Sequence, residues 1–167
     1  MLTSDILTKA RSRWTEGQTL EAGKLIFDSL PSEVRTQWAN NILRLVVERT
    51  GIKSDVIERV ISIANRPEDW GKAHDAFSAV RAKVLKLEGP AALNPQQQLL
   101  LRHLLLAELV AKVTYNATNP PDEFDEDSGW WIAPCLKGIL DLVDDTASSE
   151  AMWAMLSLDD MGGGARS

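Results

Sequence analysis

Residues 119–128 are the stretch of the sequence whose composition most suggests chemistry, because five carboxylates follow one another within it. The acidic residues are Asp122, Glu123, Asp125, Glu126 and Asp127. Clustered carboxylates suit hard cations, but the calcium loop of an EF-hand needs Gly at its sixth position and Glu at its twelfth. Aligning Glu123, Asp125 and Asp127 as the first three ligands puts a serine and a proline at those positions. We therefore expect no EF-hand and no bound metal or cofactor, and keep an irregular cation site as an alternative.

Two adjacent tryptophans, Trp130 and Trp131, follow the acidic segment. Neighbouring side chains diverge by about 100° on a helix, so both rings cannot enter the same pocket. One can pack against Leu136 and Leu140 while the other stays nearer the surface. An exposed tryptophan beside carboxylates is typical of a binding hot spot for a basic partner protein. Ordinary core packing of both rings is the alternative.

Two histidines and an arginine form a second candidate site. His74 and Arg81 fall on the same predicted inward face of a helix over residues 67–87, and His103 lies on an apolar face of the next helix. A cleft lined by all three would suit an anionic small molecule, because arginine binds carboxylate or phosphate with two parallel hydrogen bonds. The alternatives are a core histidine satisfied by a carbonyl, a threonine or a carboxylate, and an arginine in a structural ion pair with an aspartate of another helix.

Sequence signatures of known catalytic sites are missing. The chain contains no HExxH, paired ExxH, GxGxxG, phosphate-binding loop or GxSxG pattern. Its single cysteine, Cys135, follows Pro134 near a predicted helix start, where a thiolate could be favoured. The apolar neighbours of Cys135 favour a buried, inert thiol instead. We therefore assign no catalytic residue and interpret the chain as non-enzymatic.

Charge and composition limit the classes of partner and the cellular location that we expect. The net charge is −6, from 24 acidic and 18 basic residues, and an acidic domain without a basic patch is repelled by nucleic-acid phosphates. No stretch approaches the ~18 apolar residues of a membrane span, and no signal-peptide pattern occurs at the start. One cysteine excludes an intramolecular disulfide. We expect a cytoplasmic protein that binds neither nucleic acid nor membrane.

Apolar residues recur every three or four positions in almost every window, and strand-like alternation is nearly absent, so the prediction is an all-α fold. We expect a compact, irregular bundle of seven to eight helices in one domain, residues 1–160, with a flexible tail at 161–167. The central helix, about 95–117, is apolar on most sides and begins at Asn94 with Gln97 in a capping box. A helix from Trp130 to about residue 143, capped by Asp127 or Ser128, and a last amphipathic piece follow.

These features favour an acidic helical protein that binds another protein through residues 119–128 and the adjacent tryptophan. An adaptor, an immunity protein or an inhibitor would have these properties. The alternative is a small-molecule-binding protein or helical enzyme with a cleft formed by His74, Arg81 and His103. A third possibility is a subunit of a larger complex, which an exposed apolar patch around Met152 and Trp153 would favour.

Overall fold

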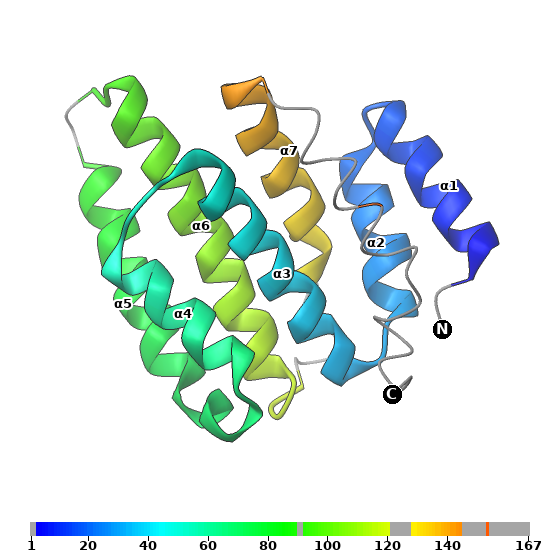
Figure 1. Cartoon of the computed structure of the whole chain (residues 1–167), viewed down its shortest axis with the longest axis horizontal. Helices are drawn as coiled ribbons and strands as arrows, with labels where there is room; N and C mark the ends of the chain where they lie inside the picture. The colour runs from blue at the N-terminus through cyan, green and yellow to red at the C-terminus, as the bar shows by residue number, and fades with distance from the viewer. Residues whose placement is uncertain (1–2, 90–91, 121–127, 145–152, 154–167) are drawn as a thin grey trace.

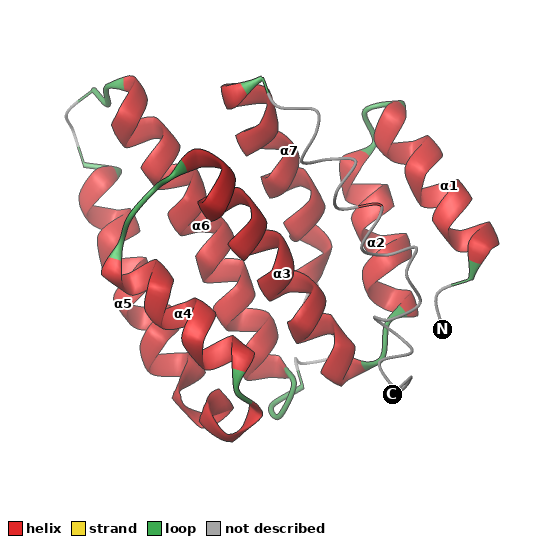
Figure 2. Cartoon of the chain, in the orientation of Figure 1, coloured by secondary structure: helices red, strands yellow, loops and turns green. Residues whose placement is uncertain are grey.

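The structure, a computed structural model, describes residues 3–89, 92–120, 128–144 and Trp153 (Figure 1). These ranges contain seven α-helices and two 3-10 turns and no strand (Figure 2), which confirms the all-α prediction. The elements are α1 (Ser4–Thr15), α2 (Thr19–Ser29), α3 (Ser32–Thr50), α4 (Asp55–Asn65), η1 (Pro67–Lys72), α5 (Ala73–Leu87), α6 (Pro95–Asn116), η2 (Ser128–Trp131) and α7 (Ile132–Val143).

The helices form two layers. Across the molecule, α1, α2, α7, α6 and α5 follow one another, and α3 and α4 lie over one side of this row (Figure 1). The helix α6 contacts α3, α4, α5 and α7, so the predicted apolar helix is indeed the central one. Because neighbours cover it on most sides, α6 can carry leucines and valines around nearly its whole circumference.

Short local signals set several helix ends. Asn94 accepts a hydrogen bond from the backbone N–H of Gln97 at 2.8 Å, and the Gln97 side chain accepts one from the N–H of Asn94 at 3.0 Å, which confirms the capping box at the start of α6. Gly51 ends α3 with φ +72°, and Gly17 follows the end of α1 with φ +86°. Glycine occupies such left-handed positions without the cost that a Cβ brings.

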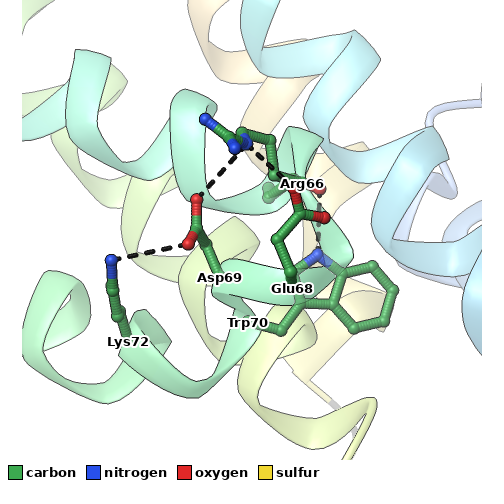
Figure 3. A network of polar contacts seen from close by, with 6 residues as sticks. Arg66, Glu68, Asp69, Trp70 and Lys72 are labelled. Atoms are coloured by element: carbon green, nitrogen blue, oxygen red, sulfur yellow. Dashed lines mark hydrogen bonds and ion pairs between the residues drawn. The ribbon is translucent and has the colours of Figure 1, made fainter.

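The prediction of one helix over residues 67–87 is wrong, because a 3-10 turn, η1, precedes α5. The Trp70 indole N–H donates to the carbonyl of Ala64 at 3.1 Å and so ties the turn to the end of α4. Arg66 lies between Glu68 and Asp69, and Lys72 also contacts Asp69 (Figure 3). The ion pairs are local to the turn, whereas the Trp70 hydrogen bond connects it to α4.

Three of the six tryptophans lie in the core. Trp38 is fully buried, and Trp14 packs edge-on against Trp153 with ring centroids 6.0 Å apart. The guanidinium of Arg11 lies over the Trp153 ring, 5.7 Å from its centroid. Trp153 is therefore buried against α1, so it is not part of an exposed apolar patch of the kind that would favour a subunit of a larger complex. Met152, the end of the domain near residue 160 and the tail at 161–167 lie outside the described residues.

None of the helices in the described part of the chain combines the length and the apolar character that crossing a bilayer requires.

Candidate functional site

Of the predicted acidic site, residues 119–128, the structure describes only the first two residues and the last one. Asp122, Glu123, Asp125 and Asp127 lie outside the described residues. On one side the chain leaves α6 in a turn, where the N–H of Asn119 donates to the carbonyl of Tyr115 at 3.0 Å. On the other side it enters η2, so the α-helix α7 begins only at Ile132, later than predicted.

The turn η2 packs closely against α2 through two glycines. A Cβ added to Gly129 would overlap the ring of Phe27, and one added to Gly23 would overlap the carbonyl oxygen of Trp130. At this contact the backbone of η2 therefore lies directly against the Phe27 ring and against α2. The result is a fixed direction for the chain as it leaves the acidic segment and enters α7.

Trp130 and Trp131 diverge, as the helical spacing predicts, and their environments differ. The indole N–H of Trp130 donates to Oδ1 of Asp28 at 2.7 Å, and the Lys24 ammonium lies 4.8 Å from its ring centroid. Trp131 instead leaves 42% of its surface exposed. The structure thus identifies Trp131 as the tryptophan nearer the surface and Trp130 as the one anchored to α2.

Trp131, the last residue of η2, lies at the start of a partly exposed face that continues along α7. Leu142 is also 42% exposed, and eleven residues are close to three helical turns, so the two side chains share that face. Cys135 and Gly138 lie between them along the same face, and we call these four residues the α7 ridge. Arg102 of α6 lies against Gly138, where its Nη1 would be 3.0 Å from an added Cβ.

The thiol on the ridge is held in its neutral form. Cys135 is half-buried, and burial raises the pKa of its thiol to about 12. The charge of Arg102 acts in the opposite direction but does not offset the loss of solvation. A thiol of this kind is a weak nucleophile near neutral pH, in agreement with the inert thiol expected from its neighbours.

His103 is a fully buried core histidine. Its Nδ1 lies 2.8 Å from the carbonyl oxygen of Leu99, and its Nε2 lies 2.8 Å from the Thr50 hydroxyl of α3. This confirms the alternative in which a carbonyl and a threonine satisfy the ring. Burial lowers the pKa of His103, although the backbone carbonyls of Leu99 and Val46 act against this effect.

The other two groups of the suggested cleft are found on a different side of α6. Arg81 of α5 donates to Glu108 at 3.1 Å, and the exposed His74 ring lies 5.7 Å from that of Tyr115. Both side chains are exposed, so the prediction that they face inward is wrong. The inter-helix ion pair expected as an alternative for Arg81 is present, with a glutamate as the partner. These contacts do not support a cleft shared by His74, Arg81 and His103.

A pocket that sequence reasoning missed lies between the start of α4, the end of α5 and the first half of α6. Its volume is about 560 Å³. The lining residues are Lys53, Ser54, Asp55, Lys83, Lys86, Leu87, Leu100 and Leu104. In the sequence, only the three-residue spacing of Lys83 and Lys86 indicates that two of these residues share a helix face. Lys53 comes close to them through the packing of α4 on α5.

Within the ranges that the structure covers, no group of three or more His, Cys, Asp or Glu side chains is arranged to hold a metal ion. No protein-family model matches the chain, and no curated protein and no solved structure matches it either.

Proposed function

We propose that this protein is a non-enzymatic interaction module that binds a basic partner protein through the acidic segment 119–128 and the neighbouring Trp131. An adaptor, an immunity protein and an inhibitor are the functional types that fit best. The observation that carries the proposal is the 42% exposure of Trp131, directly after the acidic segment and on the same face as the equally exposed Leu142.

A rigid support for the α7 ridge strengthens the proposal. The opposite face of α7 is anchored in the core by Ile132, Leu136 and Ile139, all fully buried. Large aromatic and aliphatic side chains on a fixed backbone lose little conformational entropy when a partner covers them, and tryptophan is enriched at binding hot spots. Arginine is also enriched at hot spots, and Arg102 of α6 lies against Gly138 of the ridge.

Charge supports a basic partner. Five carboxylates stand within residues 122–127, and the whole chain has a net charge of −6. Opposite charges accelerate encounter and select partners, and their effect weakens as salt screens them. The single cysteine is consistent with a reducing, cytoplasmic setting for this interaction, and the acidic charge opposes binding to nucleic acid.

Affinity capture from the native cell tests the proposal. The baits are wild type, the double variant Asp125→Lys with Asp127→Lys, and Trp131→Ser. Leu85→Ser is the matched control, because Leu85 is a large apolar side chain on α5 that is 57% exposed. We expect wild type and the control to retain the same basic protein, and both site variants to lose it. Equal recovery of that protein by all four baits would refute the proposed site.

A further inference from the structure

The pocket between α4, α5 and α6 combines an apolar floor with a positively charged rim. Leu104 is buried, and Leu87 and Leu100 are half-buried, so three leucines form the floor. Lys53, from the residues before α4, and Lys83 and Lys86, from α5, are exposed at the rim. Its volume of about 560 Å³ is in the range of sites that hold small organic molecules.

The rim lysines are not neutralised by the protein. Among the described residues, none of the three forms an ion pair, whereas Lys24, Lys72 and Lys137 each contact a carboxylate of their own or an adjoining turn. Asp55 is the single carboxylate of the pocket lining, against three ammonium groups. A chain with a net charge of −6 thus concentrates unpaired positive charge around one apolar hollow.

The edge of the pocket at α4 adds a hydrogen-bonding group. Ser54 occupies the N-cap position of α4, but its side chain makes no capping hydrogen bond. Ser54 also lines the pocket, and its hydroxyl lacks the partner that an N-cap position usually provides. An anion held by the lysines could accept a hydrogen bond from it.

We infer that this pocket binds a small anionic amphiphile, with a carboxylate or phosphate head among Lys53, Lys83 and Lys86 and an apolar tail on the leucine floor. The head gains three nearby positive charges, and the tail covers apolar surface that water otherwise contacts. Both parts are needed, because exposed lysines alone bind anions weakly and the floor alone does not select a charge. This site is separate from the α7 ridge and does not depend on the proposed function.

Nuclear magnetic resonance of the leucine methyl groups in the full chain tests the inference with four probes. Octanoate and octyl phosphate carry both head and tail, octanol lacks the charge, and inorganic phosphate lacks the tail. We expect saturable shifts at Leu87, Leu100 and Leu104 with one or both amphiphiles below their micellar concentrations, and at least tenfold weaker binding of octanol and phosphate. The stronger of the two amphiphiles identifies the head.

Variants locate the binding site. Lys83→Gln combined with Lys86→Gln removes two exposed charges without touching the core, and should weaken binding of the preferred amphiphile about tenfold. Lys72→Gln, an exposed lysine away from the pocket, should leave it unchanged. The inference is overturned if neither amphiphile saturates, if octanol or phosphate binds equally well, or if the double variant binds like wild type. Binding only to anionic phospholipid vesicles, without monomer binding, would also overturn it in favour of a membrane surface.

Discussion

The hydroxyl of Thr50 lies 2.8 Å from Nε2 of His103 and 2.7 Å from the carbonyl oxygen of Val46. Nδ1 of His103 faces the carbonyl of Leu99, so Nδ1 must carry a proton. In the neutral ring Nε2 is an acceptor, and the single hydroxyl proton of Thr50 can serve Nε2 or Val46 but not both. The buried imidazole thus depends on a threonine from another helix, which links α3 to the central helix α6.

Thr50→Val should destabilise the fold by about 1–3 kcal/mol, because it leaves a buried ring nitrogen of His103 without a partner. Thr15→Val is the matched control, since the Thr15 hydroxyl also donates to a carbonyl four residues earlier, that of Arg11, but at an exposed position. Urea unfolding followed by tryptophan fluorescence measures both free energies. Equal losses in the two variants would contradict a specific role for the pair.

Acidification should destabilise the protein through His103. Burial holds the pKa of His103 below the ordinary value of 6.5, so the unfolded chain binds more protons than the folded one once the pH falls below about 6.5. The stabilising contribution of the neutral ring is therefore complete above that pH and is lost as the pH falls through the folded-state pKa. His103→Gln should flatten the dependence of the unfolding free energy on pH between 8 and 5. A profile as steep in His103→Gln as in wild type would exclude His103 as its source.

Gly129→Ala should destabilise the fold by about 1–3 kcal/mol, because the new methyl group would overlap the buried ring of Phe27. The control is Gly71→Ala, where an added Cβ meets no atom within 4 Å. This change should be neutral or slightly stabilising, since alanine restricts the unfolded chain more than glycine does. Thermal unfolding of both variants provides the comparison. If Gly129→Ala melts at the wild-type temperature, η2 and α2 do not make the close contact described above.

Cys135 should react slowly with iodoacetamide in the folded protein. A thiol pKa of about 12, against an ordinary value of 9.0, reduces the thiolate fraction at pH 8 by about a thousandfold. We expect alkylation, followed by mass spectrometry, to be at least a hundredfold faster in denaturing urea. Similar rates in buffer and in urea would show that the thiol is not shielded.

Features encoded within a few neighbouring residues could be predicted from the sequence. The Asn94 and Gln97 capping box and the glycine end of α3 at Gly51 depend on local hydrogen bonds and backbone angles, and both occur where expected. The divergence of Trp130 and Trp131 also follows from local geometry. Which of them is exposed does not, because the partner of Trp130 is Asp28, about a hundred residues away in the chain.

The orientation of α5 explains why His74 and Arg81 do not face inward. In the sequence, the apolar residues Trp70, Phe77 and Val84 lie at helical spacing with His74 and Arg81, and this spacing predicts a common inward face. In the structure the small residues of α5 face the core instead. They are Ala73, Ala76, Val80 and Val84. Small side chains let α5 pack closely against α4 and α6. The positions of bulky apolar residues in the sequence do not indicate this packing.

The pocket between α4, α5 and α6 could not be predicted from the sequence for a similar reason. Lys53 lies thirty residues before Lys83, and no local pattern relates them. Their proximity depends on the packing of α4 against α5, which brings the start of one helix to the end of the other.

Photo-crosslinking in the native cell, with benzoylphenylalanine in place of Trp131, tests the α7 ridge as a binding surface most directly. The same probe in place of Leu85 is the comparison, because that side chain is at least as exposed. We predict one discrete adduct with a basic protein at position 131, none at position 85, and loss of the adduct when Asp125 and Asp127 are changed to lysine. The absence of an adduct at position 131, or the same adducts at both positions, would contradict the proposed function.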